Sequence, residues 1–441
     1  MNNRFLNIFA FSPKIEWLNS GYYKNNFHDK ASNLEWLWNT LPAYSPIIEN
    51  YIEQIMVPED LMEEMRLIQQ GKAKVFDNIW LNRMVEIDNP LREKIALFWH
   101  HHIPSQRGRS FDQGILLIEI FRKHGLGKLK DLLMEIISTP ATMHFLNLHI
   151  SKKQNPNENF ARELMELYVL GEGNYSLEDV KEVSRALTGR RFDRINYPYK
   201  YYLSRESFDS GKKTILGVTG NFDGEDVIDI LLKSPKAAKH VTKSFLKFFF
   251  TDLPSEKLIN DCSTIYYKSN YEMKTLINAI VSHEEFYKEV NCLTKVKTPV
   301  ELLISLQRQT GLRTVGTKTN HTFLKLAGQV LFEPPNVAGW PGGLDWLNGD
   351  KLLHRLFLPS ILLGFANRSI SKSSIKFKII SRLSMGSLRK LRYSMDAKWD
   401  PDNFHQSLFR VNLSPSEWLI GSKAIEDDTK LILQNPDYQF V

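Results

Sequence analysis

The apolar residues of this chain recur mostly at the spacing of three to four residues that marks amphipathic helices. Asn89 followed by Pro90 is a typical helix start, and the apolar run behind it predicts a helix through Trp99. Further helices are predicted over residues 111–122, 129–137, 223–311 and 350–364. The pattern therefore predicts a mainly α protein built as a multi-helix globular array.

Two successive helices joined by a short GEGNY connection are predicted next, as an αα-hairpin. Asn157 or Asn159 caps the first helix, and Gly171 ends it. Ser176 with Asp179 resembles a capping box and begins the second helix.

Two stretches break the helical period. Residues 190–222 are rich in Tyr and Gly and predict a small β-hairpin or irregular excursion. Residues 332–346, FEPPNVAGWPGGLDW, contain three prolines and three glycines, which exclude a helix and a regular strand. Near the end, alternation over 375–379 predicts a short strand, and residues 425–434 predict a last helix.

The length of 441 residues favours two or three packed regions. We expect a divergent N-terminal helical region (1–80), a helical core (81–365) and a basic C-terminal region packed on that core (366–441). Two cysteines, Cys262 and Cys292, are too few for a disulfide framework or a cysteine-rich zinc site. No apolar run approaches the roughly 18 residues of a membrane span, and the first residues make a poor signal peptide, which favours a cytoplasmic location.

The excess of basic residues behind the net charge of +7 is concentrated in one stretch of the chain. Residues 368–392 carry eight basic residues and no acid, so the rest of the chain is close to neutral. This predicts a solvated basic face, and the alternative is a stretch that binds nucleic acid, an anionic polymer or a membrane surface. Nucleic acid is an unlikely partner for the protein as a whole.

Three consecutive histidines follow the apolar run of the predicted helix at 91–99. Positions i and i+2 of an α-helix point about 200° apart. Pro104 disfavours helical backbone before it, so we expect the helix to end near His100 or His101. In extended backbone, His100 and His102 would then share a face and could bind one metal ion, with His101 pointing away. The alternative is a polar helix end whose histidines favour the helix dipole.

Arg162, Glu163 and Glu166 lie on one arc of the first hairpin helix, opposite its apolar residues. This arrangement predicts either a solvated face with ion pairs or a carboxylate cluster held by a central guanidinium. In the second case Glu163 is a metal ligand or a general base, together with Glu166.

The Pro- and Gly-rich loop at 332–346 contains Trp340 and Trp346 with Asn336 and Asp345. Exposed indole faces beside these polar groups would suit a sugar or another flat ligand. The alternative is that both tryptophans are buried and serve as structural plugs.

Several long motifs resemble the bacterial family catalogued as domain of unknown function 1800, from about residue 80 to the C-terminus. The stretches that carry the resemblance are FWHHH (98–102), NENFARELMELYVLG (157–171), SLEDVKEVSRALTG (176–189), KTILGVTGNFDG (213–224), KVKTPVELL (295–303), FEPPNVAGWPGG (332–343) and LQNPDYQ (433–439). The resemblance implies a mostly helical fold and brings no established activity. It also implies a periplasmic or surface location, a neighbouring sulfatase- or phosphatase-like partner protein and a polysaccharide ligand.

The chain departs from the family pattern at two positions. The family usually has Asn where His101 stands, and His where Phe208 stands. If the missing histidine acts in catalysis in other members, its loss weakens or abolishes activity here.

The leading hypothesis is a metal-dependent enzyme, hydrolytic rather than redox, that acts on a polysaccharide or another anionic substrate. It binds one divalent metal ion through His100, His102 and Glu163. Arg162 orients the carboxylates, and the loop at 333–346 walls the site. The alternative is a non-catalytic protein that binds polysaccharide or assembles with the sulfatase-like partner, with Trp340 and Trp346 making the contact.

Overall fold

The structure is a computed structural model that describes residues 2–14, 17, 29–47, 73–107, 111–193, 201–288, 294–311, 317–362 and 436–439. The strand predicted at 375–379 and the helix predicted at 425–434 lie outside the described residues. The same holds for Cys292 and for the basic stretch 368–392.

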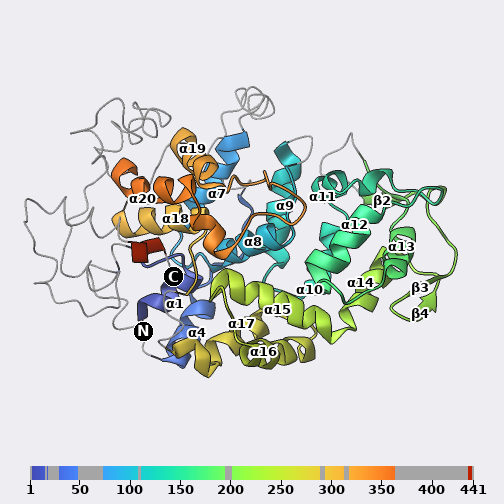
Figure 1. Cartoon of the computed structure of the whole chain (residues 1–441), viewed down its shortest axis with the longest axis horizontal. Coiled ribbons are helices and arrows are strands. Elements are labelled where there is room, and N and C mark those ends of the chain that lie inside the picture. The colour runs from blue at the N-terminus through green and yellow to red at the C-terminus, as the bar shows by residue number, and fades with distance from the viewer. Residues whose placement is uncertain are drawn as a thin grey trace, which may run out of the picture.

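The described chain is mainly helical, as its periodicity predicted (Figure 1). In chain order the α-helices are α1 (Asn2–Phe9), α4 (Lys30–Asn39), α7 (Ala73–Glu86), α8 (Leu91–His102), α9 (Phe111–His124), α10 (Leu129–Ile136), α11 (Pro140–Phe145), α12 (Glu158–Glu163), α13 (Leu177–Ala186), α14 (Gly224–Leu232), α15 (Pro235–Phe249), α16 (Glu256–Lys268), α17 (Met273–Ser282), α18 (Pro299–Thr310), α19 (Thr317–Ala327) and α20 (Asp350–Leu362). The shorter helical elements are η1 (Leu148–Ile150), the π-helix η2 (Leu164–Val169), η3 (Glu284–Tyr287), η5 (Gly343–Leu347) and η7 (Pro436–Gln439). None of the described helices is long and apolar enough to cross a membrane.

The excursion predicted at residues 190–222 is confirmed as two small antiparallel hairpins. The first pairs β1 (Arg190–Phe192) with β2 (Tyr201–Leu203). The second pairs β3 (Lys213–Ile215) with β4 (Val218–Gly220). Both hairpins lie at one end of the molecule, next to α13 (Figure 1).

The local signals of the αα-hairpin are confirmed. Asn157, not Asn159, caps α12: its Oδ1 accepts the backbone N–H of Asn159 at 2.8 Å. The Oγ of Ser176 accepts the N–H of Asp179 at 3.1 Å, and Asp179 accepts the N–H of Ser176 at 2.9 Å. The first helix ends at Gly171, which adopts a φ of +82°.

The N-terminal residues are part of the main hydrophobic core. The ring of Phe9 in α1 lies 5.8 Å from that of Phe249 in α15, centroid to centroid. Just after α1, the carbonyl of Ser12 accepts a hydrogen bond from Nε of the buried Arg308 in α18, at 2.9 Å. Residues 2–14 therefore pack into the same core as the helices that follow.

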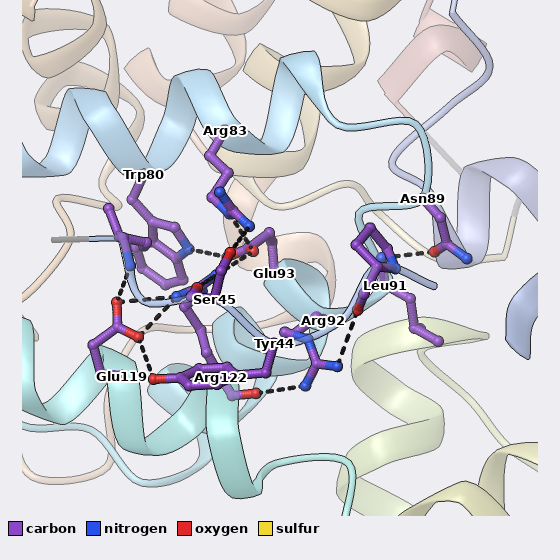
Figure 2. A network of polar contacts seen from close by, with 12 residues as sticks. Tyr44, Ser45, Trp80, Arg83, Asn89, Leu91, Arg92, Glu93, Glu119 and Arg122 are labelled. Carbon is purple, nitrogen blue, oxygen red and sulfur yellow. Dashed lines mark hydrogen bonds and ion pairs between the residues drawn. The ribbon is translucent and has the colours of Figure 1, made fainter. Parts of the chain in front are cut away.

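A buried polar network fixes α8 between α7 and α9 (Figure 2). The carboxylate of Glu93 in α8 accepts hydrogen bonds from Arg83 at 2.8 Å, Arg122 at 2.9 Å and the Trp80 indole at 3.0 Å. Arg122 also donates to the carbonyl of Ser45 at 3.0 Å, so the segment before α7 joins the same network. A buried carboxylate with three donors holds α8 rigidly, and α8 carries the histidine row at its C-terminal end.

The end of the described chain is also docked into the core. Tyr438 in η7 is buried, its hydroxyl donates to Oε1 of Gln309 at 2.5 Å, and its carbonyl accepts from Lys297 at 2.8 Å. Gln439 accepts from Nε of Arg355 at 2.9 Å. The structure describes residues 436–439 of the basic C-terminal region. Of these, Tyr438 and Gln439 contact α18 and α20.

Candidate functional site

Helix α8 does not end at His100 or His101, so the backbone predicted for the histidine row is wrong. The helix runs through His102, and the N–H of Ile103 still bonds to the carbonyl of Trp99 at 2.7 Å. Pro104 restricts Ile103 alone, and Ile103 already lies beyond the helix. His100 and His102 therefore leave the helix about 200° apart.

His100 is a buried anchor for the loop that begins at residue 332. Its side chain is fully buried, and its Nε2 accepts the backbone N–H of Phe332 at 3.0 Å. Burial lowers the pKa of His100 to about 3, so the ring is neutral and can accept this hydrogen bond. The ring also packs against Trp340, with centroids 5.0 Å apart.

His102 points instead toward the π-helix η2. Its Nε2 donates to the carbonyl of Tyr168 at 2.9 Å. His240 in α15 makes the matching contact with the preceding carbonyl, that of Leu167, at 2.7 Å. A π-helix bonds i to i+5 and is often found at functional sites, and here it presents two consecutive carbonyls, each held by an imidazole.

His102 and His240 line a common cavity of about 500 Å³, which we call the histidine cavity. It is lined by Phe98, His101, His102, Leu167, His240, Ser244, Lys247, Phe248, Asp252, Lys295, Val296, Thr298, Ala338, Gly342, Gly343 and Trp346. Most of these residues come from four of the stretches that carry the family resemblance, 98–102, 157–171, 295–303 and 332–343. Segments that are far apart in the sequence therefore converge on one cavity.

His101, predicted to point away from the site, lines the histidine cavity. Its ring packs between Trp340 and Phe248, with centroid distances of 6.3 and 5.6 Å, and it forms no hydrogen bond with any described residue. Burial lowers the pKa of His101 to about 4. The backbone of the loop comes close here because Gly339 has no side chain: a Cβ would lie 3.0 Å from the His101 carbonyl oxygen.

Charged groups face the same cavity. Lys247 is exposed on α15, whereas Lys295 is buried and pairs with Glu301 at 2.5 Å. The carboxylate of Asp252 accepts the N–H of Val296 at 3.0 Å, and burial raises the pKa of this carboxyl. The cavity thus combines neutral imidazoles, two cationic side chains and a carboxyl group that holds its proton more strongly than usual.

The predicted carboxylate cluster is only partly formed. Arg162 pairs with Glu158, one turn earlier in α12, at 3.3 Å, whereas Glu166 accepts the hydroxyl of Tyr175. Glu163 is buried, and burial, followed by the charge of Glu166, raises its pKa. Arg162, Glu163 and Glu166 are not among the residues that line the histidine cavity.

The loop residues chosen from sequence have different environments. Trp340 is 5% exposed and Trp346 is fully buried, so both fit the structural alternative. Trp346 also lines the histidine cavity. Asn336 and Asp345 are exposed, but Asn336 accepts the N–H of Ala338 within a turn, at 2.9 Å. Neither of these two lines the cavity.

The position where the family histidine is replaced lies away from the cavity. Phe208 stands between β2 and β3, and its ring lies 5.1 Å from Nζ of the buried Lys213. Lys213 also donates to the carbonyl of Asp209 at 2.6 Å. The Phe208 side chain is therefore part of a packed loop, and the substitution leaves the lining of the histidine cavity unchanged.

Sequence reasoning missed several cavity residues, and His240, Lys247 and Asp252 lie outside every motif that it singled out. His240 and Lys247 lie on α15, whose spacing indicates only an amphipathic helix, and Asp252 follows that helix in a loop. No local motif marks them, because their partners come from η2 and from the segment at 295–303.

Across the part of the chain that the structure describes, no three His, Cys, Asp or Glu side chains are grouped so as to hold a metal ion. The divalent ion, its ligands, the partner protein, the polysaccharide and the cellular location stay predictions.

Comparison with known families gives one match. The profile described as "Protein of unknown function (DUF1800)" matches residues 15–440. The matched range begins well before residue 80, where the recognisable motifs begin. No curated protein and no solved structure matches the chain.

Proposed function

This chain belongs to the DUF1800 family of proteins of unknown function, and we propose that it is a hydrolytic enzyme whose small anionic substrate binds in the histidine cavity. One observation carries the proposal: the unbonded ring of His101 faces the same cavity as Asp252 and two lysines. An imidazole without a hydrogen-bond partner that lines the same cavity as a carboxyl group and cationic side chains is a typical arrangement for acid–base chemistry on an anion.

The size and lining of the cavity support a small ligand. A volume of about 500 Å³ falls within the range of small-molecule sites. Phe98, Phe248 and Trp346 supply apolar walls, and Lys247 supplies a cation at the exposed side. Lys247 forms no ion pair within 4 Å of a described residue, and its charge acts on Asp252 in the same cavity. It is therefore placed to bind a phosphate, sulfate or carboxylate group of the substrate.

His101 is suited to activate a water molecule. With a pKa of about 4 the ring is unprotonated at neutral pH, as a general base must be. An anionic substrate beside the ring would raise that pKa, because the negative charge stabilises the imidazolium form. Asp252 is the second group that the proposal places at the reaction: burial raises the pKa of its carboxyl, against the lowering effect of the Val296 N–H and of Lys295 and Lys247. In this proposal it donates a proton to the leaving group.

The proposal is tested with p-nitrophenyl phosphate, p-nitrophenyl sulfate and p-nitrophenyl glycosides. We expect turnover of an anionic ester, a fall in kcat of about 10²-fold or more in His101→Ala, and a raised KM in Lys247→Ala. His124→Ala and Lys268→Ala, which lie outside the cavity, are the matched controls. Turnover that is insensitive to both cavity variants would contradict the proposal, as would the absence of both turnover and phosphate or sulfate binding in calorimetry.

The divalent ion predicted from the sequence is proposed alongside this activity. Elemental analysis of the purified protein tests it directly. A stoichiometric divalent metal that is retained through dialysis would support it. A protein that stays metal-free after incubation with zinc, manganese and nickel would contradict it.

A further inference from the structure

Two unusually exposed leucines directly follow residues that line the histidine cavity. Leu253 is 88% exposed and Leu344 is 69% exposed, which places both among the most exposed large hydrophobic residues of the described chain. They follow the cavity residues Asp252 and Gly343, which touch: a Cβ on Gly343 would lie 3.4 Å from Cγ of Asp252. The two leucines thus belong to separate segments that come close together at the cavity.

Contacts with buried residues hold the backbone of both leucines in a defined position. The N–H of Leu253 donates to Oγ1 of the buried Thr251 at 3.3 Å. Leu344 lies in η5, directly before Asp345 and the fully buried Trp346. Keeping large apolar side chains in water is unfavourable, and adjacent exposed ones typically mark a contact surface.

A row of lysines on α15 leads to the same cavity. The lysines share one face of the helix. Viewed down the helix axis at 100° per residue, Lys236, Lys243 and Lys247 all lie within about 60° of His240, in the same direction of rotation. All three are exposed, and none forms an ion pair with a described residue. The helix contains no acidic residue.

Few acids offset these charges. Glu256 is paired with Lys239 at 2.9 Å. Asp345 is exposed beside Leu344 and accepts a hydrogen bond from Asn348 at 3.2 Å. Asp252, directly before Leu253, is a third acid here, and the charge of Lys247 acts on it. The four α15 lysines outnumber these three acids by one, so the face keeps a small net positive charge next to two exposed leucines.

We propose that this face docks on an anionic lipid surface, with Leu253 and Leu344 inserted at the headgroup level and the α15 lysines in contact with lipid phosphates. Apolar side chains that project beside a basic stripe are the combination used by proteins that lie on a membrane without crossing it. An anionic polymer in water would use the lysines but would give the leucines no apolar environment. The docked orientation turns the mouth of the histidine cavity toward the lipid, and it does not depend on hydrolytic activity.

The test is co-sedimentation of the full chain with vesicles of phosphatidylcholine alone and with about 30% phosphatidylglycerol. We expect binding to the anionic vesicles only, weakened by added salt. Leu253→Asp with Leu344→Asp should lower the partition coefficient about tenfold or more. Lys236→Ala with Lys243→Ala should lower it about fivefold per lysine.

Two controls match these variants. Leu177→Asp alters a leucine that is also 69% exposed but lies on α13, away from the cavity. Lys152→Ala with Lys153→Ala removes two exposed charges elsewhere. Both controls should bind like the unmodified protein, and circular dichroism checks that every variant is folded.

Three results would overturn the proposal. The first is absence of binding to anionic vesicles. The second is binding that is unchanged in the double leucine variant. The third is binding to soluble heparin without binding to the vesicles, which would show an anionic polymer as the partner of the lysine row.

Discussion

The Nε2 atom of His100 accepts the backbone N–H of Phe332 across 3.0 Å, and this bond joins helix α8 to the loop that walls the histidine cavity. Phe332 has a φ of +59°, a left-handed conformation that is unfavourable for an aromatic residue. A buried acceptor at the end of a fixed helix helps to hold that conformation, so His100 has a clear structural role.

His100→Ala should therefore destabilise the protein. It removes a fully buried ring and leaves the Phe332 N–H without its partner, at a combined cost of about 3 kcal/mol. Urea denaturation measures the change, with His124→Ala as the control. Unchanged stability accompanied by loss of a bound divalent metal would instead support the metal-ligand hypothesis for His100.

Stability should fall as the pH drops below about 6.5. Burial lowers the pKa values of His100 and His102 to about 3 in the folded protein, so below 6.5 the unfolded chain binds protons that the folded chain does not. Each ring contributes up to about 1.4 kcal/mol per pH unit, so the two together cost about 4 kcal/mol between pH 7 and pH 5. Urea titrations at several pH values measure this. Burial also lowers the pKa of His101, to about 4, and that of His240, so both add to this loss in the same direction. His102→Asn should therefore remove only the share of one ring, about 2 kcal/mol between pH 7 and pH 5, and a flat profile would contradict the burial argument.

Glu301 should be essential for the core beneath the cavity. Its carboxylate pairs with two buried lysines, Lys94 at 2.9 Å and Lys295 at 2.5 Å. Glu301→Gln leaves both cations without a counter-charge, at a cost of about 3–5 kcal/mol. The control is Glu284→Gln, which breaks a solvent-screened, exposed pair with Lys257 and should have a much smaller effect. Equal effects of the two variants on the thermal midpoint would show that the buried triad is not specially stabilising.

The C-terminal segment should contribute to stability through one buried phenol. Tyr438→Phe removes the hydrogen bond to Gln309 and leaves that amide oxygen buried, which costs about 1–2 kcal/mol. Tyr267→Phe is the matched control, because its hydroxyl bonds to the Lys233 carbonyl at the surface, at 2.9 Å. Thermal unfolding compares the two, and a larger loss in the control would contradict the buried docking of η7.

The helical fold could be predicted because its signals are local. Caps act within one turn of the chain, so Asn157 and the Ser176–Asp179 pair could be recognised from spacing alone. The glycine that ends α12 and η2 was visible for the same reason. The π-helical turn could not be predicted from the sequence. Its i to i+5 bonding replaces the i to i+4 bonding of an α-helix, and its carbonyls are contacted by His240 of α15 and His102 of α8.

The directions of the three histidine rings could not be predicted from local sequence. Pro104 restricts only the residue before it, Ile103. The tertiary fold decided that α8 continues through His102, so that Ile103 lies beyond the end of the helix. The direction of each ring then depended on what surrounds α8: Phe332 for His100, the open cavity for His101 and η2 for His102.

The sequence by itself determined the helices, the irregular loop and the membership of the motifs in one family. It did so because helix caps, apolar periodicity and Pro–Gly breaks are properties of neighbouring residues. Only the tertiary structure decided that His101 lines the same cavity as His240, Lys247 and Asp252. These residues are far apart along the chain, and their proximity follows from the packing of α8, α15 and two loops, which no spacing in the sequence encodes.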